Sequence, residues 1–197
     1  MNYRKLLFAS PFLIAAAVVL APRSESQGKT TSYKIDAGHS AVVFKIMHFG
    51  AAYTWGRFND MAGALSFAEG GEGSAVEVTV KTASVDTNDK KRDDHLRSPD
   101  FFSAKEFPEI KFKSTKWTKS SSGWDVAGDL TLHGVTKPVT VKVVKTGGEV
   151  DDPWGNVRIG FEGELRIKRS DFGMKKMIGP VGDDVWLGIS IEAMRKK

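Results

Sequence analysis

The sequence predicts an all-β domain of about eight to ten antiparallel strands with one short helical crossover. Three observations predict this class. Apolar and polar residues alternate along many short runs, clusters of turn-forming residues separate the runs at hairpin-like spacing, and one charged segment carries helix caps. Such a chain folds into a sandwich or closes into a barrel, and closure removes exposed sheet edges.

Residues 1–26 are expected to be a signal peptide, with cleavage after position 21 or 26. Arg4 and Lys5 precede an apolar run from Leu6 to Leu20, which is shorter than the roughly 20 residues of a membrane-spanning helix. An uncleaved anchor is the alternative. We expect residues 27–197 to form one exported, periplasmic domain with no stable membrane span after cleavage, or a secreted one where no outer membrane exists.

The composition excludes several classes of protein. The chain has no cysteine, so it has neither a disulfide framework nor a lipid-modified cysteine, and a packed core and a hydrogen-bonded sheet must stabilise it. The net charge of +5 falls to +3 after cleavage at either site, because two more positive than negative residues are lost. Opposite charges are interleaved along the chain, and no basic stripe with stacking aromatics indicates nucleic-acid binding.

The strand predictions follow from period-two alternation, which gives each strand one apolar and one polar face. The clearest row is Val157, Ile159, Phe161, Gly163, Leu165 and Ile167, and the residues between its members are charged except for Gly160. The run from Ser40 to Phe49 is apolar on both faces, so we expect it to be covered on its outer side as well. The remaining alternating runs, in chain order, are 76–81, 110–113, 139–143 and 185–191.

The helical crossover is predicted within Asp86 to Phe102. Asp86-Thr87-Asn88 are good helix-capping residues, and Leu96 is the one apolar residue between them and Pro99. Ser98-Pro99 is expected to start a second short turn.

Several blocks of sequence carry a resemblance to a known family. They are Tyr33-Lys34-Ile35-Asp36, His39-Ser40, Arg92 to Phe102, Gly128 to Thr136 and Arg169 to Gly173. Over roughly residues 33–194 the chain resembles the YceI-like family of polyisoprenoid-binding, lipocalin-like barrels. The resemblance implies an antiparallel eight-stranded lipocalin-like barrel with an apolar tunnel and a long-chain lipid as its ligand. It implies no chemical reaction, and it leaves room for a homodimer.

A lipid-binding interior is expected from the inward rows together with this resemblance. Burying about 400 Å² of apolar surface contributes ~10 kcal/mol at ~25 cal/mol per Å², of which ordering the chain takes back several kcal/mol. The ligand is expected to be of isoprenoid type, a polyprenyl lipid or a quinone. The alternative is a cell-envelope structural or interaction module whose barrel is filled by side chains. The expected lipid-binding residues are Phe44, Phe67, Val78, Phe112, Leu130, Val141, Phe161, Leu165, Leu187 and Ile189.

Arg92, His95 and Arg97 are the candidates for the tunnel mouth and the lipid head group, because a forked guanidinium suits phosphate. The alternative is that these side chains only hold the crossover against the barrel.

Neither a metal site nor catalysis is expected. His39, His48, His95 and His133 do not pair at a short metal-ligand spacing, and no cysteine is available. The sequence has no Gly-x-Ser-x-Gly turn and no nucleophile with an evident base. We therefore expect a binding protein with no cofactor apart from the bound lipid, and not an enzyme.

Overall fold

The computed structural model describes residues 29–197. The expected signal peptide and its two cleavage positions lie outside the described residues. Within the described part of the chain, no helix is long and apolar enough to cross a bilayer.

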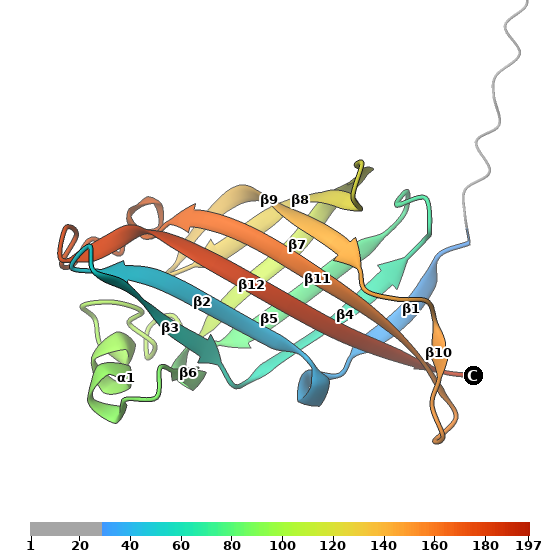
Figure 1. Ribbon diagram of the computed structural model, residues 1–197, viewed down its shortest axis with the longest axis horizontal. Coiled ribbons are helices and arrows are strands. Elements are labelled where there is room, and N and C mark those ends of the chain that lie inside the picture. Colours follow the sequence, from blue (N-terminus) through green and yellow to red (C-terminus); the bar gives the residue numbers. More distant parts are fainter. Residues whose placement is uncertain (1–28) are drawn as a thin grey trace, which may run out of the picture.

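The described residues form one antiparallel sheet with a single α-helix (Figure 1). The helix is α1 (Lys90–Arg97), and three 3₁₀ turns are η1 (Ala37–His39), η2 (Thr82–Ser84) and η3 (Arg169–Phe172). The strands are β1 (Thr31–Ile35), β2 (Ala41–His48), β3 (Ala52–Phe58), β4 (Met61–Phe67), β5 (Ala75–Lys81), β6 (Val85–Asp86), β7 (Glu109–Lys119), β8 (Trp124–Leu132), β9 (Val135–Lys145), β10 (Val150–Asp151), β11 (Asn156–Lys168) and β12 (Val181–Lys196).

These segments make a closed barrel of eight strands, three of which are broken in two. β1 and β2 lie one after the other along the same side of β12. β4 and β3 pair with them in turn, and β5 and β6 pair with β4 and β3. The other five barrel strands, β7, β8, β9, β11 and β12, are continuous, and β12 closes the ring by pairing with β11. The antiparallel eight-stranded barrel with a helical crossover is therefore confirmed.

The wall follows the alternation in the sequence. Along β11, Ile159 and Phe161 are buried, while Glu162 and Glu164 are exposed. The turn between β8 and β9 consists of His133 and Gly134, both with positive φ (51° and 74°). Positive φ at both central residues is the hairpin geometry that matches the twist of the sheet.

The helix begins later than the capping residues at 86–88 suggested. Asn88 has a φ of 61°, which no helical residue adopts, and Asp89 is the N-cap. Its carboxylate accepts the backbone N–H of Arg92 at 2.8 Å. Ser98-Pro99 forms a single turn after α1, in which the Phe101 N–H donates to the Ser98 carbonyl.

On the outer face of β2, Lys45 lies among aromatic side chains of the same sheet. The ammonium of Lys45 lies 5.0 Å from the ring centre of Tyr53, 5.3 Å from that of Trp55 and 5.9 Å from that of Trp186. This cation–π cluster explains why an apolar run can tolerate a solvent-facing side.

Different structures close the two ends of the barrel. At one end the wall itself contributes an aromatic cluster, in which Phe67 lies 5.3 Å from Trp124 and 5.0 Å from Phe161 between ring centres, and Trp117 packs beside them. At the other end, where β2 ends and β12 begins, lie α1 and the segment that follows it (Figure 1). Leu96 and Phe102 from this segment pack against the core.

Candidate functional site

The barrel encloses an apolar cavity with an empty volume of about 880 Å³, solvent-connected space included. Many of its lining residues, Val78, Phe112, Leu187 and Ile189 among them, face inward and yet are only partly buried. Inward side chains that keep exposed surface show that the interior is not filled by the chain itself. Its lining is apolar apart from Glu162, as is typical of sites for small apolar ligands.

A second apolar cavity, of about 740 Å³ on the same measure, adjoins the first. The two share Ile110, Leu130 and Leu187 as lining residues. The second cavity extends under α1, where Leu96 and Phe102 line it. Together the two hollows form an elongated apolar space, which suits an extended chain better than a compact ring.

The structure places the ten residues predicted to bind lipid as follows. Phe44 lines the second cavity. Phe67 lines neither cavity and packs instead into the aromatic cluster, in contact with Phe161. The other eight line the first cavity: Val78, Phe112, Leu130, Val141, Phe161, Leu165, Leu187 and Ile189.

Two glycines allow large rings to lie flat against the wall. A Cβ at Gly56 would stand 2.3 Å from the Cζ of Phe44, and a Cβ at Gly128 would stand 2.6 Å from the Cζ of Phe112. Neither approach is possible for a residue with a side chain. The two rings therefore occupy space next to the backbone, which keeps the centre of the barrel open.

The three residues considered for the head group make other contacts. Arg92 donates to the hydroxyl and the carbonyl of Thr87, both at 2.7 Å. Arg97 donates to the carbonyls of Ala83 and Val85, at 2.8 and 2.9 Å. None of the three lines either cavity. Arg97 therefore has the contacts expected if it holds the crossover against the barrel, whereas the bonds of Arg92 lie within the crossover.

His95, the third of these residues, bonds Asp100 at 3.0 Å. Its ring also packs edge-on against that of Phe101. The contact joins α1 to the turn that follows it, so it too is internal to the crossover.

Sequence reasoning did not single out Arg169 as a site residue. It is buried, lines the second cavity, and donates to the carbonyls of Gly182, Met174 and Val181. Burial lowers the pKa of Arg169, and the nearby carboxylate of Asp183 acts in the opposite direction. Its position in the block Arg169 to Gly173 was the available signal, but nothing in the sequence shows that an arginine there faces an apolar space.

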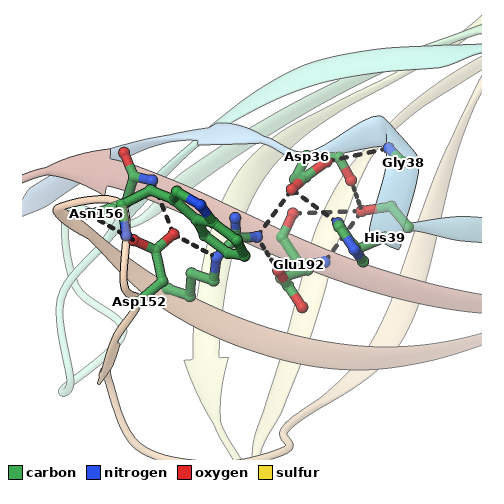
Figure 2. Close-up of polar contacts among 9 residues, drawn as sticks. Asp36, Gly38, His39, Asp152, Asn156 and Glu192 are labelled. Atoms are coloured by element: carbon green, nitrogen blue, oxygen red, sulfur yellow. Dashed lines mark hydrogen bonds and ion pairs between the residues drawn. The ribbon is translucent and has the colours of Figure 1, made fainter.

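One polar network, drawn in Figure 2, brings together a group with the residue types of a metal site. Ligand atoms of Asp36, His39 and Glu192 lie within 4.8 Å of one another. Arg158 already stands among them, bonding Asp36 at 2.8 Å and also bonding Glu192. A guanidinium in this position supplies the positive charge that a metal ion would bring, so the network suits an ion pair better than a cation site.

The pKa shifts agree with this structural role. Hydrogen bonds from Arg158 and His39 hold the pKa of Asp36 below its ordinary value. Burial alone would raise the pKa of Asp152, but hydrogen bonds from Asn156 and Arg158 outweigh burial and lower it. Carboxylates with lowered pKa values are poor general bases near neutral pH.

Comparisons with known proteins match this architecture. The chain matches the YceI-like domain over residues 33–193. It is 43% identical to Protein YceI of Escherichia coli O17:K52:H18 over 195 residues, covering 98% of this chain and 96% of the relative. A UPF0312 protein of Pseudomonas aeruginosa is 43% identical over 187 residues, covering 93% of this chain and 97% of the relative.

Two solved structures share the fold. The crystal structure of Burkholderia cenocepacia BcnA has a TM-score of 0.71 and 25% identity, covering 80% of this chain and 98% of that one. A structure described as a polyisoprenoid binding domain from Saccharophagus degradans has a TM-score of 0.60 and 17% identity, covering 82% and 97%. The domain match and the close relatives, joined to the closed barrel with its apolar interior, show that the chain belongs to the YceI-like family.

Proposed function

We propose that this protein binds a long-chain, isoprenoid-type lipid, a polyprenyl lipid or a quinone, inside the barrel and carries it. The observation behind the proposal is the pair of adjoining cavities, lined almost wholly by apolar side chains. Burial of the lipid tail would supply most of the binding free energy. The similarity in fold to a polyisoprenoid binding domain supports the same class of ligand.

The lipid-binding residues of this proposal are the nine predicted ones that line the two cavities, with Phe67 behind them in the aromatic cluster. The open interior argues against a filled barrel acting only as a structural module. We further propose that the chain is exported to the periplasm. We also propose that it performs no chemical reaction, since the apolar cavities hold no pair of side chains suited to acid–base or nucleophilic catalysis.

Extraction of the purified protein with organic solvent, followed by mass spectrometry, tests the proposal. We expect a co-purified isoprenoid lipid, or saturable uptake of an added short-tailed benzoquinone by the delipidated protein. Absence of both results would contradict the proposal.

A matched pair of variants tests where the lipid lies. Val78→Asp places a carboxylate in the cavity, whereas Thr79→Asp places it on the outer face of the same strand. We expect the first to abolish lipid uptake and the second to preserve it, because a charge buried without a partner costs several kcal/mol. Equal uptake by the two variants, both folded by circular dichroism, would show that the lipid binds elsewhere.

A further inference from the structure

One part of the barrel wall is not hydrogen-bonded. β11 pairs with β12 along its whole length, from Asn156 to Lys168, and β9 pairs with β8 along residues 135–143. Between β9 and β11, however, the described pairing covers only the four positions from Phe161–Lys145 to Glu164–Lys142. Residues 135–141 and 165–168 therefore face each other across a seam without pairing.

The sequence contains a reason for the seam. Leu132 and Val135 flank the two-residue turn between β8 and β9, so their backbones form a hydrogen-bonded pair. From this pair onward, successive residues of β9 direct their backbone N–H and C=O groups alternately toward β8 and away from it. By this alternation the backbone of residue 138 points away from β8 and toward β11. Residue 138 is Pro138, which has no N–H to donate. The ladder ends at Lys142, and Pro138 prevents it from resuming through position 138, as expected where proline lies at a sheet edge.

The seam joins the interior to the outside. Leu165 lines the inner cavity and also two hollows on the outer surface of the wall. Thr140 borders both outer hollows. One contains Lys137, Arg166 and Lys168 together with Asp171 and Asp184, and the other contains Lys45, Lys142 and Arg166 together with Glu164. Arg166 is ion-paired with Asp184 at 2.8 Å, which leaves the lysines as the excess positive charge. Leu165 is thus the residue at which the three spaces meet, and the charged side chains around it are of both signs with cations in excess.

Side chains cover both ends of the barrel. The aromatic cluster of Phe67, Trp117, Trp124 and Phe161 closes one end, and its four members are each buried. At the other end Leu96, Phe101 and Phe102 line the cavity from outside the sheet. A hydrogen bond from Arg97 to the carbonyl of Val85 in β6 holds this segment to the wall.

We infer that the seam between β9 and β11 is the portal through which a lipid tail enters and leaves the barrel, with Leu165 as its gate. This inference rests on the proposed lipid-binding function and deepens it. The tail passes between strands that separate without breaking a hydrogen bond, and a polar or anionic head group stays outside among the cationic side chains. A lipid can then exchange while both ends of the barrel remain closed.

A reversible block of the seam tests the portal. Because the chain has no cysteine, Thr140→Cys gives a single thiol on the outer rim, to which a bulky aromatic group is attached as a mixed disulfide. The probe is a benzoquinone with a two-isoprene tail, whose binding quenches tryptophan fluorescence, and release is measured by mixing the loaded protein with phosphatidylcholine vesicles. We expect association and release both to slow by about tenfold, equivalent to ~1.4 kcal/mol in each barrier, with little change in affinity.

The control is Thr79→Cys carrying the same group. Thr79 is paired on both sides, with Ala62 and Lys111, so its label lies over an intact wall. Reduction should restore the rates of the labelled Thr140→Cys protein. If the labelled Thr140→Cys protein exchanges the quinone as fast as the labelled control, the portal proposal is wrong, whatever affinity that protein has for the quinone. If the unlabelled protein binds no quinone, the proposed function fails and the portal with it.

A second variant needs no label. Pro138→Thr supplies the missing N–H, so we expect the ladder to extend toward Lys168 and exchange to slow while the affinity stays the same. Exchange as fast as in the unchanged protein would contradict the role assigned to this proline.

Discussion

The two ends of the barrel are closed in different ways. At one end the cover is part of the wall, because Phe67, Trp117, Trp124 and Phe161 project from the strands themselves. At the other end the cover is α1 and the turn after it, a separate segment held to β6 by a hydrogen bond from Arg97 to the Val85 carbonyl. The first closure cannot open without disrupting the sheet. The second can loosen while the sheet stays intact, so the two ends should differ in stability.

The largest effect is expected at the aromatic end. Trp124→Ala removes a ring that contacts Phe67, Trp117 and Phe161, and we expect a loss of about 3–5 kcal/mol in the free energy of unfolding, as for other large buried aromatics. Urea denaturation measures this loss. A cost below ~1 kcal/mol would mean that the cluster is not a unit of the core.

A smaller and more local effect is expected at the helical end. Arg97→Met removes the donor to two backbone carbonyls, and charged hydrogen bonds of this kind contribute about 1.5–3 kcal/mol each before solvent exposure reduces the value. We expect faster hydrogen exchange at the amides of residues 90–104, with the sheet amides unchanged. Lys91→Met, at an exposed position on the same helix, is the control. If the amides of residues 90–104 are equally protected from hydrogen exchange in both variants, the helical end is not held by Arg97 and the proposed difference in stability between the two ends is wrong.

Next in size is a change to the wall beneath the helical end. Gly56→Ala forces the ring of Phe44 away from the backbone and into the second cavity, at a cost of about 1–3 kcal/mol typical of overpacking. We expect weaker binding of long-tailed lipids than of short-tailed ones, because only the far part of the cavity is reduced. Titration with quinones of increasing tail length measures this difference. A uniform loss across tail lengths would contradict it.

The smallest expected effect is on the pH dependence of stability. It involves Arg158, which forms ion pairs with Asp36 and Asp152. Both carboxylates have pKa values lowered by folding. The unfolded chain therefore binds more protons below the ordinary aspartate pKa of about 3.9, and stability falls as pH drops through that range. We expect Asp152→Asn to lower the melting temperature at pH 7 and to flatten its fall between pH 5 and pH 3.

The neighbouring variant Asp151→Asn is the control for this pH dependence, because Asp151 is exposed. A melting temperature with the same pH dependence in both variants would show that the Arg158 network does not contribute to acid sensitivity.

Alternation along the chain was sufficient to predict most of the wall. Phe161, Leu165 and Ile167 face inward as the period-two pattern requires, because a pleated strand leaves no other choice once its register is set. The breaks in the first three barrel strands were not predictable in this way. Two of them lie at the 3₁₀ turns η1 and η2 and the third at Asn59 and Asp60, and the alternation on either side stays intact.

The chemistry of the crossover was harder to predict than its location. An arginine that binds a phosphate and an arginine that binds a carbonyl look alike in a sequence, and Arg97 is of the second kind. Likewise, Arg158 and Asp36 meet only because β1 and β11 both neighbour β12. Contacts of this kind depend on tertiary closure, which no local pattern encodes.

The ring topology has a consequence for how the protein is made. The second to seventh barrel strands can each pair with the strand before them, but the strand that completes the cylinder is the last, Val181–Lys196. Until that strand is in place, the apolar inner surface of the sheet stays exposed, and both edges of the sheet are free to pair with other chains. Truncation near the C-terminus should therefore produce aggregation instead of a smaller soluble domain.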